Sequence, residues 1–192
     1  IPDSFDFYWK APAAAYDLAK AKKLLAEAGF RNGFDAGDYT CDSSYANLAE
    51  AVLNSLQEAG IRVKLRPLER AAFFAAYSEK KLKNIIQGSS GAFGNAATRL
   101  EAFVARGGAY AYGSYPEIDA LFAEQATELD VTKRTAMLHR IQQIVHERSL
   151  YAPIWQLAFI NGLGKRVGES GLGLIRGHAF SAPYEDVTIK QN

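Results

Sequence analysis

The stretch IIQGSSGAFGNAATRL, residues 85–100, has the order of residue types from which many ligand-binding loops are built. A pair of isoleucines precedes a loop rich in glycine and serine, and a segment that favours a helix follows. Loops between a strand and a helix can hold phosphate on backbone N–H groups or place a nucleophilic serine at a sharp turn. Phosphate binding, serine catalysis and plain solute binding are therefore the hypotheses to compare.

The glycine spacing argues against a nucleotide site. Gly88, Gly91 and Gly94 follow the pattern G-x-x-G-x-x-G, and no lysine comes directly after them. Dinucleotide and P-loop motifs need G-x-G-x-x-G or G-x-x-x-x-G-K-[ST], because that spacing brings the backbone close to the phosphates. We therefore expect no nucleotide cofactor at this loop. No other cofactor is expected either.

A serine hydrolase is a nearer match, because the letters GSSGA at 88–92 approach the G-x-S-x-G nucleophile elbow. Ser90 would be the nucleophile, with Ala92 in place of the last glycine. The base would have to be one of three histidines, His139, His146 or His178. His139 and His146 are seven residues apart on one helical face beside charged neighbours, which favours a solvent-facing position. Hydrolysis with Ser90 is kept as the alternative hypothesis.

No metal site is expected. Seven residues place the imidazoles of His139 and His146 about 10 Å apart along a helix axis, too far to share one ion. Acidic pairs such as Asp35 and Asp38 have no neighbour that would set their pKa values apart. Cys41 is the single cysteine, so an internal disulfide and a cysteine zinc site are both excluded.

The overall composition is that of an ordinary globular chain of 192 residues, with 48% apolar residues. Lys and Arg number 22 against 21 Asp and Glu, and a net charge of +1 gives no footprint for nucleic acid or an anionic membrane. No apolar run approaches the roughly 20 residues of a membrane-spanning helix. The chain begins IPDSFDFYWK, without an initiator Met or signal-like segment, so we expect a processed product or an excised piece.

Strands and helices are predicted to alternate in the first half of the chain. Asp17 can cap a helix that Gly29 ends, and Gly60 ends a second one. Ile61, Val63 and Leu65 alternate with basic residues, as in a strand with one solvated face. The predicted segments are a helix at 17–28, a strand at 34–41, a helix from Ser43 or Ser44 to Ala59, a strand at 61–66, a helix at 69–82 and a strand at 81–87.

Helices dominate the second half. The letters SYPE at 114–117 predict a capping box, and Asp130 can cap a longer helix that reaches about Arg148. We expect Leu129 to belong to the apolar stripe of the first of these helices. Residues 150–163 are β-branched and aromatic, and they predict one or two strands in which Trp155 and Phe159 belong to the core. The glycine-rich residues after 167 predict loop and extended structure.

Three segments, in order along the chain, resemble one protein family. These are YDLAKAKKLLAEAGFRNGF (16–34), LAEAVLNSLQEAGIRVKLRPLERAAFFAAY (48–77) and the stretch from YGSYPEIDALF to GKRV (112–167). They are similar to family 5 extracellular solute-binding proteins, the dipeptide and oligopeptide receptors of ABC importers. Leu18 replaces the proline of that family's Tyr-Asp-Pro motif. The order and spacing match over about residues 12–167.

The resemblance implies an α/β fold, with a mixed sheet flanked by helices, that forms one lobe of a type II periplasmic-binding-protein-like architecture. Residues 1–167 would be the second, C-terminal lobe. Residues 168–192 would return towards a first lobe that is absent from this chain. A solute would then be held in the cleft between the two lobes, where the ends of parallel strands expose backbone groups.

The same resemblance places the loop GSSGAFGN in that cleft, so the loop is expected to hold a ligand and not to react. Peptide receptors of the family carry a tryptophan here, and then an aspartate that pairs with the peptide's α-ammonium. Ser89 stands at the tryptophan position and Ala92 near the aspartate, so a peptide held by its N-terminus is not expected. A polar, aromatic or acidic small molecule suits the loop. The implied ligand-binding residues are Gly88, Ser89, Ser90, Gly91, Ala92, Phe93, Asn95 and Arg99.

The resemblance further implies a monomeric, non-enzymatic component of an ABC importer in the periplasm, or anchored outside the membrane. Its partners would be a small solute, the membrane subunits of a permease and its own N-terminal lobe, with no nucleic acid. Besides the Ser90 hydrolase, a free-standing interaction module that uses Tyr110, Tyr112 and Tyr115 remains an alternative.

Overall fold

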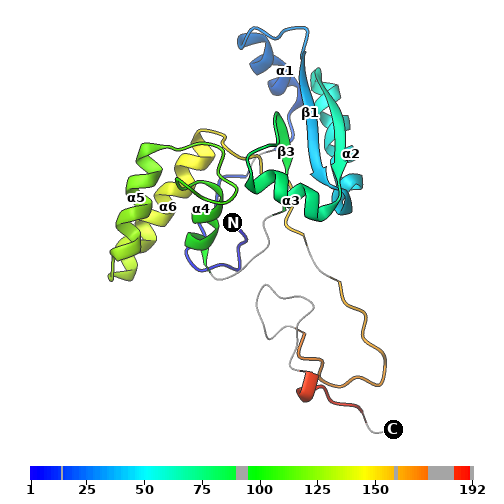
Figure 1. Ribbon diagram of the computed structural model, residues 1–192, viewed down its shortest axis with the longest axis vertical. Helices are drawn as coiled ribbons and strands as arrows, with labels where there is room; N and C mark the ends of the chain where they lie inside the picture. The colour runs from blue at the N-terminus through cyan, green and yellow to red at the C-terminus, as the bar shows by residue number, and fades with distance from the viewer. Residues whose placement is uncertain (14, 90–94, 158–159, 173–183, 191–192) are drawn as a thin grey trace. The chain divides into compact units, whose positions relative to one another are not determined.

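Alternating strands and helices form the first half of the chain, and helices dominate the second (Figure 1). The computed structural model describes residues 1–13, 15–89, 95–157, 160–172 and 184–190. The chain divides into two units. The sheet unit is Pro12–Ser89 with Gly107–Tyr112, and the helical unit is Ile1–Ala11, Ser90–Arg106 and Gly113–Asn192.

The sheet unit follows the predicted order of elements. Asp17 accepts the backbone N–H of Lys20 at 2.8 Å and so caps the first helix, as the sequence predicts. Gly60 ends a later helix in the left-handed conformation, with φ of 96°. The elements are α1 (Leu18–Glu27), β1 (Phe34–Asp42), a 3-10 turn (Ser43–Tyr45), α2 (Ala46–Ala59), β2 (Ile61–Leu68), α3 (Arg70–Ser78) and β3 (Ile85–Gln87).

The sheet has the order β2-β1-β3, and all three strands are parallel. The chain moves from β1 to β2 on one side and then returns past β1 to β3 on the other. Because crossovers are right-handed, this reversal puts α2 and α3 on opposite faces of the sheet, and Figure 1 shows them flanking β1. The α/β class is confirmed. A mixed sheet was expected, but helical crossovers make the described strands parallel.

The core of the sheet unit lies between β1 and α2. Tyr39 and Cys41 are 1% and 0% exposed, and they point to the face that Ala49 of α2 covers. Val63 and Leu65 of β2 pack on the same cluster. The alternation read in β2 is therefore confirmed: its apolar residues face α2, and its basic residues face solvent.

The helical unit is built on α4 (Ala96–Phe103), α5 (Pro116–Thr127) and α6 (Val131–Glu147). Asp130 caps α6 as predicted, accepting the backbone N–H of Thr132 at 2.8 Å and of Lys133 at 3.2 Å. Leu138 and Ile141 are fully buried in the apolar stripe of α6. The core consists of Ala97, Leu100, Val104, Ile118, Leu138, Ile141 and Ile144.

The buried amide of Gln142 fastens the start of the chain to α6. Its Nε2 donates to the carbonyl of Phe7 at 2.8 Å, and its Oε1 accepts the N–H of Trp9 at 3.1 Å. The guanidinium of Arg134 lies 5.3 Å from the centre of the Phe7 ring. A polar side chain in the core thereby satisfies backbone groups of an irregular segment, whose Asp6 carbonyl also accepts the N–H of Ala96 at 3.0 Å.

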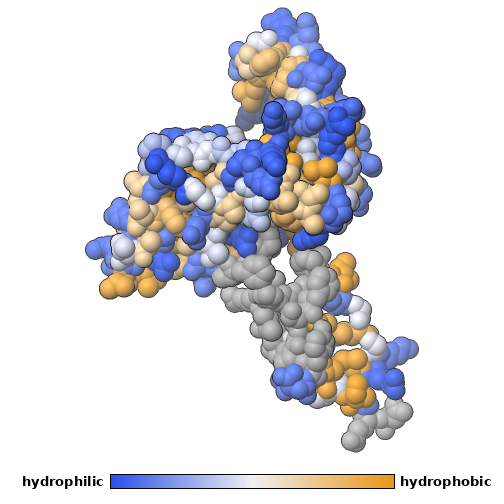
Figure 2. All heavy atoms as spheres, in the orientation of Figure 1, coloured by the Kyte–Doolittle hydropathy of each residue, from blue (hydrophilic) through white to orange (hydrophobic). Residues whose placement is uncertain are grey.

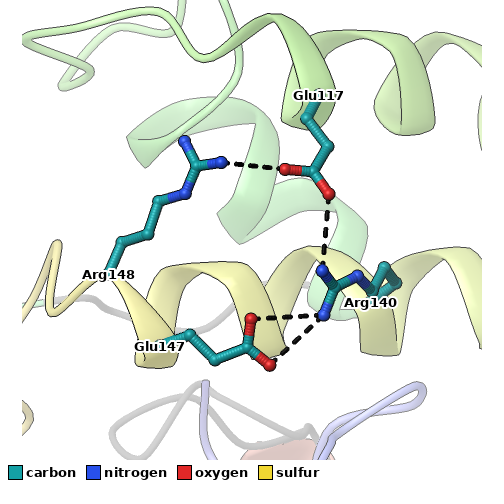
Figure 3. Close-up of polar contacts among 4 residues, drawn as sticks. All are labelled: Glu117, Arg140, Glu147 and Arg148. Carbon is teal, nitrogen blue, oxygen red and sulfur yellow. Dashed lines mark hydrogen bonds and ion pairs between the residues drawn. The ribbon is translucent and has the colours of Figure 1, made fainter.

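Charged side chains join α5 to the C-terminal end of α6 (Figure 3). Glu117 accepts Nη2 of Arg148 at 2.9 Å and Nη2 of Arg140 at 3.4 Å, while Nη1 of Arg140 lies 3.2 Å from Glu147. These side chains are 42% to 58% exposed, so solvent screens the network. It orients the two helices more than it stabilises them.

Two predicted caps are wrong. Asp42 takes the place of Ser43 and Ser44, because its carboxylate accepts the N–H of Ser44 at 3.0 Å and the chain forms a 3-10 turn before α2 begins. The SYPE capping box does not form either. Pro116 is the first residue of α5, so Tyr115 stands at the N-cap and Ser114 is one residue too early.

The predicted strand at 150–163 is wrong for the residues that the structure describes, since 151–157 and 160–163 form no strand. Trp155, expected in the core, is 48% exposed, and Phe159 lies outside the described residues. Leu129, expected on the helical stripe, is 94% exposed in the linker between α5 and α6. Figure 2 shows hydrophobic side chains on the surface of the segment after α6. A strand needs a partner, and the described residues of this segment pair with no strand.

The residues after 167 are irregular where they are described, as predicted. Val167 and Ile189 form one antiparallel bridge, and a 3-10 turn spans Tyr184–Asp186. Within the described residues, none of the helices combines the length and the apolar character that a bilayer crossing requires.

Candidate functional site

The carboxyl-terminal edge of the sheet is the natural place for a ligand in this topology. Strand order reverses between β1 and β3, so the crossovers leave the sheet in opposite directions, and α/β proteins commonly bind ligands outside the strand ends at such a point. Asp42 at the end of β1 is aligned with Leu68 of β2, and Cys41 is aligned with Gln87 of β3. Asp42, Gln87 and the Gly88–Ser89 dipeptide therefore meet at one edge.

Asp42 is a buried carboxylate with two charge-assisted partners. Its side chain is 3% exposed, and Oδ2 accepts Nη1 of Arg70 at 2.7 Å. Its Oδ1 accepts the N–H of Ser44 at 3.0 Å. Because both oxygens are engaged, the negative charge of Asp42 is satisfied inside the protein. The Arg70 guanidinium also lies 5.1 Å from the centre of the Phe74 ring.

Gln87 is fixed by a buried tyrosine. The hydroxyl of Tyr39 donates to Oε1 of Gln87, which leaves the amide N–H groups of Gln87 as donors. Gly88 follows directly, and a Cβ at that position would lie 3.3 Å from Cε1 of Tyr77. The chain therefore leaves β3 close against an aromatic ring.

The free energy of unfolding should depend on pH in the alkaline range, because the buried Tyr39 titrates there. Burial, with a smaller contribution from Cys41, raises the pKa of Tyr39 from 10.0 to about 12. The unfolded chain loses this proton at about pH 10 while the folded chain keeps it, so the free energy of unfolding falls as pH rises from 10 to 12. A shift of this size corresponds to about 2–3 kcal/mol.

Urea unfolding of the wild type and Tyr39→Phe at pH 8 to pH 12 would check this expectation. The variant should lose about 1 kcal/mol at pH 8, because the bond to Gln87 is gone, and it should show a shallower decline above pH 10. Parallel pH profiles for the two proteins would contradict the assignment. Cys41 remains in both, so its own raised pKa, caused mainly by burial, affects them equally.

The predicted ligand-binding residues fall into three groups. Gly88 is exposed and Ser89 half-buried at the end of β3 in the sheet unit. Asn95 and Arg99 belong to the helical unit, where Asn95 caps α4 by accepting the N–H of Ala97 at 3.0 Å. Ser90, Gly91, Ala92 and Phe93 lie outside the described residues. Of the eight predicted residues, Gly88 and Ser89 lie at the carboxyl-terminal edge of the sheet, and the side chain of Asn95 is used to cap α4.

The alternatives gain no support from the described residues. His146 packs edge-on against Trp9, with ring centres 5.7 Å apart, His139 lies on the same helix, and His178 falls outside the described residues together with Ser90. In the described part of the chain, no group of three or more His, Cys, Asp or Glu side chains could hold a metal.

The aromatic residues of the interaction-module hypothesis are largely used inside the protein. The rings of Tyr110 and Tyr112 lie 4.9 Å and 5.7 Å from Tyr77. The hydroxyl of Tyr112 accepts the N–H of Leu82 at 3.2 Å. Tyr112 is 45% exposed, and Tyr115 lies 5.9 Å from the guanidinium of Arg148.

Three polar residues of the strand edge were not predicted from the sequence. The sequence patterns singled out none of Asp42, Arg70 and Gln87. A usable signal exists, since each stands at or just after the end of a parallel strand, where ligand contacts gather. It requires the strand order, which single-sequence patterns do not reveal.

A parallel sheet whose strand order reverses at a polar carboxyl-terminal edge is the architecture of α/β ligand-binding lobes. The chain belongs to the family of bacterial extracellular solute-binding proteins, family 5, whose middle-region model matches residues 1–111. It is homologous to the substrate-binding proteins of ABC transporters. Solute-binding proteins of this kind are not enzymes as a class. A comparison with curated protein sequences gives no match.

Solved structures share the fold. The periplasmic binding protein DppA from Helicobacter pylori, in complex with the peptide STSA, has a TM-score of 0.76 and 21% identity, over 99% of this chain and 38% of that one. AgaA from A. tumefaciens R10, in complex with agropinic acid, has a TM-score of 0.66 and 27% identity, over 78% and 32%. A periplasmic oligopeptide-binding protein from Borrelia burgdorferi has a TM-score of 0.67 and 27% identity, over 78% and 31%.

These similarities confirm the predicted family and the periplasmic-binding-protein fold. The chain spans between 31% and 38% of the length of these three proteins. What the whole protein binds, and what it delivers the ligand to, therefore has to be proposed and tested.

Proposed function

We propose that this chain is the C-terminal lobe of the substrate-binding component of an ABC importer. The lobe would hold a small solute against a second lobe, and closure of the two would be recognised by a membrane permease. The observation that carries the proposal is the family match over residues 1–111, which includes every strand of the sheet and the edge where Asp42, Gln87 and Gly88 meet.

The two-lobe arrangement is supported by surface that the described chain leaves uncovered. Exposed apolar side chains follow α6: Tyr151, Ile154, Trp155, Leu157, Ile160 and Leu163 are 42% to 93% exposed. Several exposed apolar side chains along one segment are what a contact with another protein surface would cover. Residues 1–167 would form the C-terminal lobe, and residues 168–192 would return towards the N-terminal lobe. That N-terminal lobe would cover the exposed apolar segment after α6.

The ligand-binding loop is proposed to be Gly88, Ser89, Ser90, Gly91, Ala92 and Phe93, with Asn95 and Arg99 beyond it. Two relatives bind the peptide STSA and agropinic acid, so peptide-like and other polar or aromatic solutes are the candidates for this chain. The loop carries no acidic residue between 88 and 95, which disfavours an ammonium group as the recognised end of the ligand. No cofactor is required for binding of this kind.

The proposed setting is the periplasm or the outer face of the membrane, with the permease subunits as partners and a monomer as the working form. In this role the protein captures and releases its solute unchanged. Hydrolysis with Ser90 would contradict that, and a fluorophosphonate probe distinguishes the two: we expect no labelling that Ser90→Ala removes.

Calorimetry on the 192-residue chain and on the full-length gene product would test the proposal, with agropinic acid, STSA and a set of dipeptides as probes. We expect the full-length protein to bind at least one probe and the chain alone to bind it at least about tenfold more weakly, because it supplies about half of the contacts. Ser89→Ala should weaken binding, whereas Ser55→Ala, on the exposed side of α2, should not. Equal affinity of chain and full-length protein would overturn the two-lobe mechanism.

A further inference from the structure

Arg70 is held in one orientation at the polar edge of the sheet. Its Nη1 donates to Oδ2 of Asp42 at 2.7 Å, and its guanidinium lies 5.1 Å from the centre of the Phe74 ring. The Asp42 side chain is 3% exposed, whereas that of Arg70 is 57% exposed. A buried anchor and an aromatic ring therefore fix one edge of the guanidinium, while much of the group faces solvent.

The outer edge of this guanidinium has donors to spare. Arginine carries five N–H donors in a planar fork. Within the residues that the structure describes, Asp42 is the acceptor that Arg70 contacts, and it takes Nη1 alone. A fork oriented in advance loses little rotamer freedom when a second carboxylate arrives, and its planar geometry suits two parallel bonds.

Other polar groups at the carboxyl ends of the strands can also donate hydrogen bonds. The hydroxyls of Ser43 and Ser44 are exposed next to Asp42, and the amide of Gln87 has its oxygen occupied by Tyr39. Both carboxylate oxygens of Asp42 are engaged. This edge therefore offers hydrogen-bond donors to a ligand, and the carboxylate of Asp42 is already engaged.

Glu69, the acidic residue directly before Arg70 in the sequence, is occupied as well. Oε2 of Glu69 accepts the N–H of Ala71 at 2.8 Å and of Ala72 at 3.2 Å, so this carboxylate caps α3. Its charge is thus partly satisfied by backbone donors. Repulsion of an incoming anion by Glu69 and Asp42 is reduced, because both are bonded within the protein.

We propose that Arg70, oriented by Asp42 and Phe74, binds a carboxylate of the transported solute. This inference rests on the proposed solute-binding function and narrows its ligand to molecules with an acidic group at this edge. Asp42 is a positioning residue, because it acts through Arg70 and both of its oxygens are already bonded.

A nuclear magnetic resonance titration of the 192-residue chain tests this assignment. The probes are sodium glutarate and its uncharged analogue glutaramide, at an ionic strength held constant with sodium chloride. We expect saturable shifts of the Arg70 Nε–H and of the Ser44 and Gly88 amides with glutarate, and no such shifts with glutaramide. Arg70→Gln should weaken glutarate binding about tenfold or more, the size expected for one charge-assisted pair.

Arg62→Gln is the matched control. Arg62 is an exposed arginine on the solvent face of β2, so its loss changes the net charge equally without touching the strand edge. Its glutarate affinity should stay within about twofold of wild type, as expected for a screened surface charge. If Arg70→Gln and Arg62→Gln bind glutarate equally well, or if chloride alone reproduces the shifts, the carboxylate site is overturned.

A second variant protects the test against misfolding, since Arg70→Gln leaves the buried Asp42 without its cation. Arg70→Lys can keep the pair with Asp42 but has no second planar edge, so it should fold and still lose glutarate affinity; undiminished affinity in Arg70→Lys would overturn the assignment. Failure of this inference is separable from failure of the proposed function. If the full-length protein binds a solute equally well with and without Arg70, the carboxylate site alone is refuted. If the full-length protein supports no solute import through its permease, the transport role is refuted.

Discussion

Gly33→Ala should lower the free energy of unfolding of the sheet unit by at least about 4 kcal/mol, or prevent its folding. Gly33 has φ of 71°, and a Cβ there would lie 2.7 Å from the carbonyl carbon of Gly60 and closer still to its oxygen. That oxygen accepts the N–H of Phe34 at 3.1 Å, the bond that starts the pairing of β1 with β2. Left-handed strain, a backbone clash and a lost hydrogen bond therefore act together.

Gly29→Ala separates the strain from the clash. Gly29 also has a positive φ, 91°, but a Cβ there would meet no atom within 4 Å. Only the conformational cost remains, about 1 kcal/mol. Urea unfolding followed by far-ultraviolet circular dichroism gives both values. Equal losses in the two variants would mean that the backbones of Gly33 and Gly60 do not approach as the structure describes.

The glycines also show where sequence patterns stop being informative. Gly60 is predicted to end a helix because a helical pattern runs up to it, and it does so with φ of 96°. Gly33 stands in an ordinary RNGF turn. Its positive φ is a local requirement, but the clash that a Cβ would meet comes from the backbone of a residue 27 positions later, and that approach follows only from the register of β1 with β2.

Local patterns predicted the elements whose partners are also local. Asp17 and Asp130 cap their helices as expected, and the alternation from Ile61 to Leu65 marks the buried face of β2. The segment at 150–163 has strong strand propensity, but its described residues pair with no strand, so propensity alone misled. The SYPE box failed by one position, because Pro116 occupies the first helical residue.

The candidate site was predictable only as far as the loop. Gly88 and Ser89 stand out because they interrupt a strand-to-helix pattern, and the structure puts them at the end of β3. Arg70 and Asp42 are 28 residues apart, and each looks like an ordinary charged residue at an element boundary. The order β2-β1-β3 brings them together, and a single sequence does not disclose strand order.

Ile141→Ala should destabilise the helical unit by about 2–5 kcal/mol, the range for truncating a buried isoleucine. Ile141 is 0% exposed and packs in the cluster that contains Ile118, Leu138 and Ile144, so its removal leaves a cavity between α5 and α6. Leu129→Ala is the control. Leu129 is 94% exposed in the linker before α6, and its loss should change the free energy of unfolding by less than about 0.5 kcal/mol.

Two probes can show which unit each substitution affects. Trp9 lies against His146 in the helical unit, so its fluorescence follows that unit. Cys41 is 0% exposed in the sheet unit, and its reaction with a thiol reagent requires that unit to open. Each unit has a hydrophobic cluster of its own, so Ile141→Ala should shift the Trp9 transition more than the labelling of Cys41, and Gly33→Ala should do the reverse. Equal shifts of both probes in both variants would mean that the two clusters unfold as one cooperative core.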